Sequence, residues 1–239
     1  MFSIISVYNN KKTLNDYLLK SLKKQNTNYE LILVDNSGGR FKSMAKALNF
    51  AAKKTKKQSK YIMFVHQDID FCSGDWLEKA EKILDSILNL GIAGIAGMSN
   101  KGENNKERGR NIIEHGKSKE LWSWGNIIKK PEEVQTLDEC LFIIPRSVFN
   151  KLKFDEETCD NWHLYGVDYC LSIKNYNLGA YAIPMFVYHE SSGYSMSPEY
   201  YITLKKIIKK HKKKYQSIYT TTGDWNTFLP LALQRLIKK

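Results

Sequence analysis

This chain of 239 residues lacks long apolar segments, and its glycines and prolines are sparse. No apolar run approaches the roughly 20 residues that span a bilayer. The N-terminus has no basic leader and no cleavage site, which argues against a signal peptide. Its 14 glycines and 5 prolines are scattered, so no repeat and no flexible linker divides the chain. We therefore expect one large domain with a substantial core.

Cysteine is also scarce. The four cysteines, at positions 72, 140, 159 and 170, show none of the close pairing that marks a structural metal site. We expect reduced thiols, as in a cytoplasmic protein.

Negative charge is in short supply as well, because 37 lysines and arginines face 25 aspartates and glutamates, for a net charge of +12. Nucleic acid, an anionic membrane or a phosphorylated substrate would each suit this excess. Nucleic-acid binding is kept as an alternative function. It is disfavoured because the basic run at 53–57 contains no aromatic residue and no nucleic-acid-binding motif appears.

Apolar runs alternate with amphipathic segments along the chain, which predicts βαβ units and a parallel sheet. Strands are predicted at 2–8, 29–34, 61–65, 92–97, 134–137, 138–145 and 180–188. Helices are predicted from about 10–13 to 24, at 42–54 and 75–88, through 168–174 and from Pro198 onward. Residues 100–119 have no periodicity and are predicted to form an irregular excursion, followed by a short strand at 121–126.

The run at 61–65 leads directly into His66-Gln67-Asp68-Ile69-Asp70. Ligands bind beyond the carboxyl ends of parallel strands. If the chain stays extended, Asp68 and Asp70 project to the same side and suit a divalent cation that holds a phosphate. In the alternative interpretation Asp68 is a turn residue and Asp70 caps the next helix.

A series of short motifs follows the predicted strands in a fixed order. They are Ser6-Val7-Tyr8-Asn9-Asn10, Val34-Asp35-Asn36-Ser37, His66-Gln67-Asp68-Ile69-Asp70, Tyr165-Gly166-Val167-Asp168-Tyr169-Cys170-Leu171 and Val187-Tyr188-His189. The series resembles the family-2 glycosyltransferases of GT-A fold, and its His-Gln-Asp form is similar to a glycosyltransferase-2-like subgroup. The resemblance covers residues 1–195. It implies a catalytic domain with a mixed, mostly parallel central sheet flanked by helices. Residues 196–239 lie beyond the resemblance, and we expect them to form a basic helical extension packed on or beside that domain.

The resemblance implies an inverting, metal-dependent glycosyltransferase. The donor would be a nucleotide diphosphate sugar, with a UDP-sugar as first choice, and the acceptor a hydroxyl of a glycan or lipid-linked molecule. The cofactor would be Mn²⁺ or Mg²⁺. A sugar-nucleotide-binding protein without turnover is a further alternative. A nucleotidyltransferase is disfavoured, since the first strand is not followed by a glycine-rich loop.

Particular residues receive roles from the resemblance. The nucleotide would contact Val7, Tyr8, Asp35, Asn49 and Asp68. The metal would be held by Asp70 with Asp68 and His189.

The general base would be Asp168, for which a helix cap is the alternative. The substrate would contact Asp138, Glu139, Trp162 and His163, and Trp122 and Trp124 could stack on sugar rings, although tryptophan is most often a core residue.

Residues 198–214 carry seven lysines on a helical pattern whose other side is apolar. The first interpretation is a surface helix packed on the sheet with its lysines in solvent. The second is a peripheral membrane contact that brings the enzyme to a lipid-linked acceptor.

Overall fold

A seven-stranded sheet runs through the centre of the computed structural model, which describes residues 1–111, 114–115, 125–190 and 196–237. Its strand order is β2 (Tyr29–Asp35), β1 (Phe2–Tyr8), β3 (Tyr61–Val65), β11 (Leu141–Pro145), β5 (Leu90–Gly94), β12 (Gly179–Ala182) and β9 (Glu132–Val134). The pairings make five strands run one way, with β11 and β9 opposed. The predicted mixed, mostly parallel α/β sheet is confirmed.

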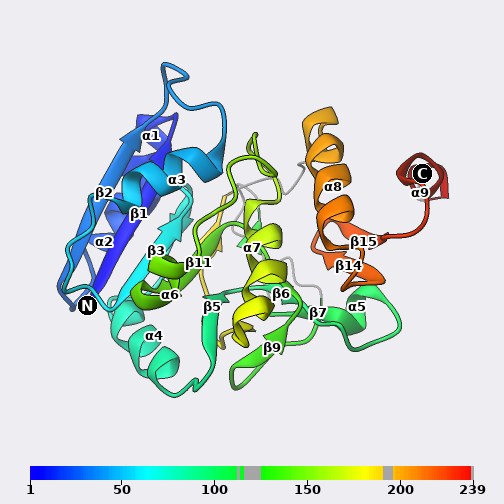
Figure 1. The fold of residues 1–239 in the computed structure, drawn as a ribbon. Coiled ribbons are helices and arrows are strands. Elements are labelled where there is room, and N and C mark those ends of the chain that lie inside the picture. Colours follow the sequence, from blue (N-terminus) through cyan, green and yellow to red (C-terminus); the bar gives the residue numbers. More distant parts are fainter. Residues whose placement is uncertain (112–113, 116–124, 191–195, 238–239) are drawn as a thin grey trace.

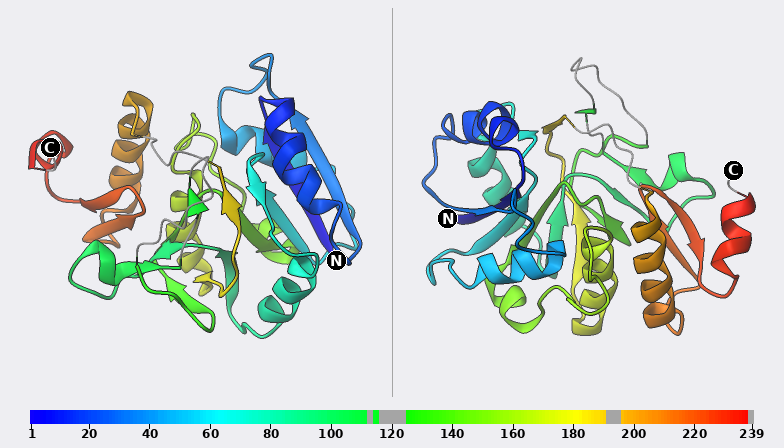
Figure 2. Two further views of the ribbon diagram at one scale, coloured as in Figure 1. Left: turned by 180° about the vertical axis from the view of Figure 1, so that it is seen from behind. Right: turned by 90° about the horizontal axis from the view of Figure 1, so that it is seen from above.

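Helices cover both faces of this sheet (Figures 1 and 2). One face packs against α3 (Met44–Ala52), α6 (Arg146–Lys151), α7 (Tyr165–Ile173) and α8 (Pro198–His211). The other packs against α1 (Lys11–Leu14), η1 (Asn15–Leu19), α2 (Lys20–Leu22) and α4 (Trp76–Asp85). Successive strand residues point to opposite faces, so Phe64 enters the first core and Met63 the second. This is why the central strands read as unbroken apolar runs.

Strands β2, β1 and β3 are parallel, so their carboxyl ends lie at one edge of the sheet. Tyr8 is paired in register with Asp35 across β1 and β2. The backbone N–H of His66 donates to the carbonyl of Cys140 at 2.9 Å, which places the end of β3 beside the segment that leads into β11. The polar residues that follow these strands therefore converge.

The predicted strand at 180–188 is two strands. β12 ends at Ala182, and β13 (Tyr188–His189) joins a separate small sheet with β4 (Ile69–Asp70) and β8 (Glu114–His115). Pro184, between them, lacks the N–H that a ladder would need. In the small sheet His189 pairs with Ile69, and the N–H of Glu190 donates to the carbonyl of Asp68 at 3.1 Å. The break thus carries His189 to Asp68.

Helix α7 approaches the sheet closely at Gly166. A Cβ at this position would lie 2.0 Å from the Phe142 ring, so no larger side chain fits without displacement. The preceding Leu164 has a left-handed backbone with φ of 62°, a conformation that costs a residue with a Cβ about 1–2 kcal/mol.

The C-terminal part shares the core of the sheet. The apolar face of α8, with Tyr200, Leu204 and Ile207, is buried with Ile218 and Trp225 of the hairpin formed by β14 (Ser217–Thr220) and β15 (Gly223–Asn226). The helix of the lysine-rich segment is therefore packed on the core, but its lysines are not all in solvent, because Lys210 donates to the buried Asp168. The hairpin was not predicted, so the extension is not purely helical. A boundary at 195 stays a prediction.

Smaller elements complete the chain: β6 (Gly97–Met98), α5 (Asn105–Arg108), β7 (Gly109–Arg110), β10 (Thr136–Leu137), η2 (Lys174–Tyr176) and α9 (Leu231–Ile237). The expectation of an irregular excursion at 100–119 is wrong for α5 and β7. The predicted strand at 121–126 falls mostly outside the described residues. No helix in the described ranges is both long enough and apolar enough to cross a bilayer.

Candidate active site

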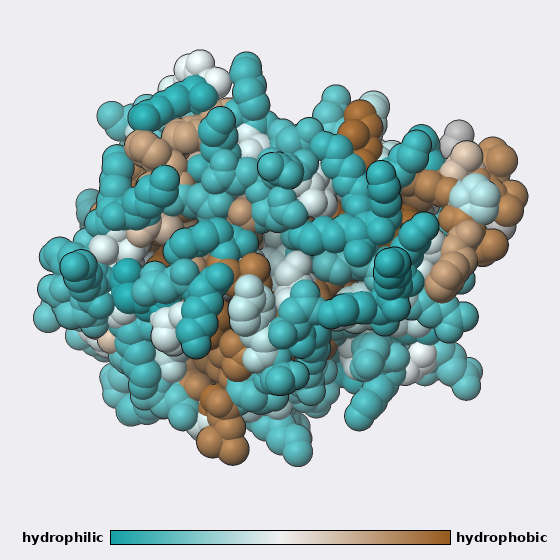
Figure 3. All heavy atoms as spheres, in the orientation of Figure 1, coloured by the Kyte–Doolittle hydropathy of each residue, from teal (hydrophilic) through white to brown (hydrophobic). Residues whose placement is uncertain are grey.

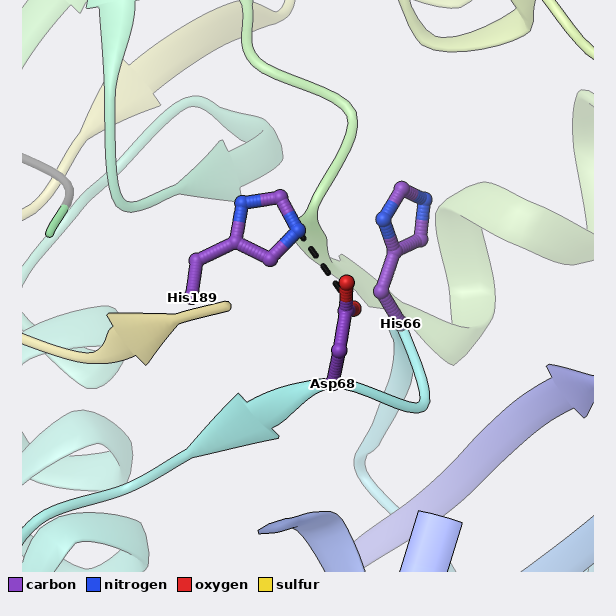
Figure 4. Close-up of side chains that lie close together, drawn as sticks. All are labelled: His66, Asp68 and His189. Atoms are coloured by element: carbon purple, nitrogen blue, oxygen red, sulfur yellow. Dashed lines mark ion pairs between the residues drawn. The ribbon is translucent and has the colours of Figure 1, made fainter. Parts of the chain in front are cut away.

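Three side chains meet at the carboxyl edge of the sheet, and Figure 4 shows them. His66 follows β3, Asp68 lies in the turn before β4, and His189 ends β13. One potential ligand atom from each lies within 4.8 Å of the others, and no second group with such spacing occurs among the described residues. The Nε2 atom of His189 is 3.4 Å from Oδ1 of Asp68. We call these three residues the edge cluster.

The charge states of Asp68 and His66 suit the binding of a cation by the edge cluster. Burial opposes ionisation of Asp68, but the hydrogen bond and charge of His189, with a smaller contribution from His66, lower the pKa of its carboxyl to about 2. Burial lowers the pKa of His66, which favours its neutral form. A carboxylate and neutral imidazole nitrogens form a donor set that binds divalent metals. The residues present therefore fit a divalent cation.

Asp70 lies outside the edge cluster. Its Oδ1 accepts the backbone N–H of Cys72 at 2.7 Å, so it closes a turn. The prediction assumed an extended chain from 68 to 70, but residues 67–68 form a turn and the strand resumes only at Ile69. Among the described residues His66, not Asp70, joins Asp68 and His189 in the edge cluster, and the metal-ligand role of Asp70 stays a prediction.

Gln67 fixes the loop beside the edge cluster. Its Oε1 accepts the N–H groups of Asn9 and Asn10 at 3.1 and 3.0 Å, and its Nε2 donates to Oδ1 of Asn9 at 2.8 Å. The ends of β1 and β3 are joined through this one side chain, which gives a structural reason for glutamine between His66 and Asp68.

The predicted nucleotide residues divide into two groups. The Tyr8 hydroxyl donates to Oδ2 of Asp35 at 3.1 Å, at the ends of β1 and β2, with Val7 buried in the core beneath. The hydroxyl and N–H of Ser37 are the main causes that lower the pKa of Asp35. Asn49 is elsewhere engaged: its amide binds the backbone of Phe154 and the Glu156 carboxylate. These bonds argue against a nucleotide contact by Asn49.

Asp168 is buried at 2% exposure and faces α8. Its Oδ2 accepts from Lys210 at 2.7 Å, and its Oδ1 lies 2.8 Å from Nε2 of His211. A general base must reach the proton of the acceptor hydroxyl. Both oxygens of Asp168 are bonded to internal partners in this structure, and the catalytic role predicted for it stays a prediction.

Glu139 and Asp138, the two acids that precede β11, differ in the groups that their oxygens bind. Both oxygens of Glu139 accept backbone N–H groups, from Leu164 at 2.8 Å and Gly166 at 2.7 Å, while burial raises its pKa to about 8. Glu139 thus holds the start of α7. Asp138 is partly exposed; one oxygen accepts the N–H of Cys140 and the other the Thr221 hydroxyl, both at 3.1 Å. Its charge acts on His66, so Asp138 lies near the edge cluster.

Trp162 and His163 lie on the segment that Glu139 anchors. Trp162 is exposed, and the His163 ring is 3.1 Å from the Ser197 hydroxyl and packs edge-on against Tyr200. Their substrate roles stay predictions. Trp122 and Trp124 lie outside the described residues.

Comparison with known proteins shows that the sequence profile of the glycosyltransferase-like family matches residues 3–216. The chain belongs to the glycosyltransferase-like family. No curated protein matches the sequence.

Solved structures share the fold of this glycosyltransferase-like chain at low identity. GalNAc-T7 with UDP, GalNAc and Mn²⁺ superposes with a TM-score of 0.60 at 13% identity, over 87% of this chain and 47% of that protein. TarS 1-349 of S. aureus with UDP-GlcNAc gives 0.56 at 16%, over 87% and 66%. The Pyrobaculum calidifontis mannosyltransferase PcManGT with GDP-Man and Mn²⁺ gives 0.59 at 12%, over 90% and 64%. The chain spans less than two thirds of each. The GT-A fold is thereby shown.

Sequence reasoning placed Asp68 and His189 at the same site but missed His66 as a third donor. The available signal was its position two residues before Asp68 at a strand end.

Proposed function

We propose that this chain transfers a sugar from a nucleotide diphosphate donor, a UDP-sugar as first choice, to a hydroxyl of a glycan or lipid-linked acceptor. The observation that carries the proposal is the edge cluster at the strand ends, beside Tyr8 and Asp35, in a member of a glycosyltransferase-like family. The similar folds solved with UDP-GlcNAc and with GDP-Man support a nucleotide-sugar donor.

The cation would be held by His66, Asp68 and His189, and it would neutralise the charge on the diphosphate leaving group. Mg²⁺ prefers oxygen ligands, whereas Mn²⁺ also accepts imidazole nitrogen. Two imidazoles with one carboxylate therefore favour Mn²⁺ over Mg²⁺, and Mn²⁺ is present in two of the similar structures.

The nucleobase would lie at the ends of β1 and β2. Asp35 is exposed and its lowered pKa keeps it ionised at neutral pH, so it can accept the imide N–H of uracil. Tyr8 offers an aromatic face next to it, and stacking of a base on such a face contributes about 1–3 kcal/mol.

An inverting mechanism needs a base on the acceptor side, and Asp138 is more exposed than Asp168, although the oxygens of both accept hydrogen bonds from internal groups. Asp138 is partly exposed and close enough to His66 to influence it electrostatically. Its neighbour Glu139 has both oxygens occupied by backbone N–H groups. We assign deprotonation of the acceptor hydroxyl to Asp138.

A thermal-shift panel of UDP-, GDP- and dTDP-sugars, with and without Mn²⁺, tests the donor class. A UDP-sugar should raise Tm only in the presence of Mn²⁺, and Asp68→Asn should remove the shift. Asp70→Asn is the matched control and should keep it. Absence of a shift with every nucleotide, in the intact protein, would contradict the proposal. Binding without transfer or hydrolysis would leave a sugar-nucleotide-binding protein without turnover.

A lipid-linked acceptor would require contact with a membrane, and the structure changes where this contact can occur. The apolar face of α8 is buried in the core. Apolar side chains are instead exposed around α9: Phe228 at 71%, Leu236 at 70% and Ile202 at 56%. Figure 3 shows this apolar area at the right edge, where Figure 1 places α9.

This α9 surface adjoins a groove of about 630 Å³ whose lining includes Lys205 and Arg235 but no acidic residue. Exposed apolar groups rimmed by cations match an anionic lipid surface. A symmetric contact between two copies would place the same cations against each other.

Sedimentation with anionic and neutral vesicles tests this. The protein should bind anionic vesicles, and Phe228→Ser with Leu236→Ser should weaken binding about tenfold. Leu88→Ser, at a fully exposed leucine elsewhere, is the control. Equal binding of all variants would refute a membrane contact at the α9 surface, and binding of none would refute any membrane contact.

A further inference from the structure

The hydroxyl of Tyr165 lies between a ring of the edge cluster and a backbone carbonyl. It is 3.3 Å from Nε2 of His66 and 3.2 Å from the carbonyl oxygen of Glu139. Tyr165 is 3% exposed, so solvent does not compete for these bonds. In Figure 4 the other ring nitrogen of His66, Nδ1, faces the side of Asp68 and His189.

The direction of these hydrogen bonds follows from counting protons. A carbonyl oxygen only accepts, so the single hydroxyl proton of Tyr165 must point to Glu139. The hydroxyl can then only accept from His66, and Nε2 of His66 must carry the proton. A neutral imidazole has one N–H, so Nδ1 of His66 keeps its lone pair.

The backbone around Tyr165 is held on both sides. The two oxygens of Glu139 accept the N–H groups of Leu164 and Gly166, the residues that flank Tyr165. Gly166 lies against the Phe142 ring, and the Phe142 and Tyr165 rings pack edge to face with centroids 5.8 Å apart. The hydroxyl therefore has little freedom to turn away from His66.

We infer that Tyr165 is a positioning residue that fixes His66 in the Nε2–H form, so that the Nδ1 lone pair faces the cation. The inference rests on the proposed function, because it assumes a divalent cation at the edge cluster. Outer hydrogen bonds of this kind orient metal-ligating histidines, and their loss weakens metal affinity about 10–100-fold.

Tyr165→Phe tests the inference by removing the hydroxyl and keeping the ring. The matched control is Tyr169→Phe on the same helix: Tyr169 is 1% exposed and its hydroxyl donates to the Leu152 carbonyl at 3.1 Å. Tyr165→Phe loses the hydrogen bonds to His66 and to the Glu139 carbonyl, Tyr169→Phe loses the one to the Leu152 carbonyl, and only the first touches His66. Mn²⁺ affinity, measured by electron paramagnetic resonance, should fall about tenfold in Tyr165→Phe and stay within about twofold in Tyr169→Phe.

A second readout needs neither activity nor a bound metal. In ¹⁵N-histidine-labelled wild-type protein, the His66 signals, assigned with His66→Asn, should show a protonated Nε2 and a bare Nδ1. In Tyr165→Phe the two forms should both be populated. A protonated Nδ1 in the wild type would overturn the inference even if the variant failed to fold. So would equal Mn²⁺ affinities in the three proteins.

The proposed function fails in a different way. It fails if wild-type protein binds no Mn²⁺ with UDP present, whatever the form of His66. The two ideas can therefore be rejected separately.

Discussion

Two histidine–carboxylate pairs in this molecule have opposite surroundings. In the edge cluster, Asp68 meets His189 at 3.4 Å, and no lysine or arginine among the described residues forms an ion pair with it. In the second pair, Asp168 meets His211 at 2.8 Å and also Lys210 at 2.7 Å. We call Asp168, Lys210 and His211 the helix cluster.

The difference is one of charge compensation. A buried carboxylate is costly unless a positive charge offsets it. Lys210 supplies that charge to Asp168 inside the protein, so the helix cluster needs nothing from outside and joins α7 to α8. Asp68 has imidazoles beside it, whose nitrogens are potential ligands of a cation. The same residue types thus form an internal ion-pair network in one place and a candidate cation site in the other.

The largest expected effect is on the edge cluster. Asp68→Asn should lower Mn²⁺-dependent sugar transfer by on the order of 10²–10³-fold, the range found when a group that stabilises developing charge is removed. Without metal the variant should also be less stable at neutral pH, because the lowered pKa of Asp68 means that the folded state favours its ionised form. Transfer rates and Mn²⁺ binding measure the first effect, and thermal unfolding measures the second. Activity close to that of the wild type would show that Asp68 is not a metal ligand.

The second prediction concerns the helix cluster. Asp168→Asn should leave Mn²⁺ affinity unchanged and destabilise the fold by about 3 kcal/mol, since it leaves Lys210 and His211 without their carboxylate partner. For a domain of this size that is roughly 6–12 °C in Tm. A folded variant of normal Tm that has lost transfer would instead support the predicted catalytic role of Asp168.

A third prediction concerns the pH dependence of the free energy of unfolding, through Asp155, the second carboxylate that pairs with Lys210. Burial opposes ionisation of Asp155, but Lys210 and the N–H and hydroxyl of Thr158 outweigh it, so the pKa of Asp155 lies well below its ordinary value. A lowered folded pKa gives stability that is present above the unfolded pKa of about 3.9 and is lost as pH falls below it. Relative to Asp155→Asn, the wild type should therefore be more stable by about 1 kcal/mol at pH 6 and by less at pH 3.

The matched control for this titration is Asp160→Asn, which breaks the more exposed pair between Asp160 and Lys206. Such surface pairs contribute a few tenths of a kcal/mol. Denaturant unfolding at several pH values measures both variants. A pH-independent difference for Asp155→Asn would argue against its pairing with Lys210.

The smallest expected effect is at Asp70. Asp70→Asn keeps an oxygen that can accept the Cys72 N–H, so activity should stay within about twofold and stability within about 0.5 kcal/mol. Transfer assays beside Asp68→Asn measure the contrast. Losses of similar size in both variants would indicate that Asp70 also binds the cation.

Local pattern was enough to predict much of the sheet. The apolar run Tyr61–Val65 is buried on both faces and became a central strand, and Tyr8 and Asp35 follow their strands to a common edge. Convergence of strand ends is a property of parallel sheets, so it could be inferred without knowing any contact between distant residues.

Contacts between distant residues could not be inferred in this way. Nothing near Asp168 in the sequence indicates that Lys210 and His211, 42 and 43 residues later, would enclose it. Because residues 67–68 form a turn, His66 and not Asp70 lies in the edge cluster with Asp68. The pairing of β13 with β4 likewise depends on a strand break at Pro184. The α9 surface could not be predicted from the lysine pattern of α8, because the apolar face of α8 is buried.

The most direct test of the central claim is the position of the cation. Crystals grown with Mn²⁺ and UDP should give an anomalous scattering peak bonded to His66, Asp68 and His189, with Nδ1 of His66 as the ligand atom. A peak at Asp70 or Asp168, or none at the edge cluster while UDP is bound, would contradict it.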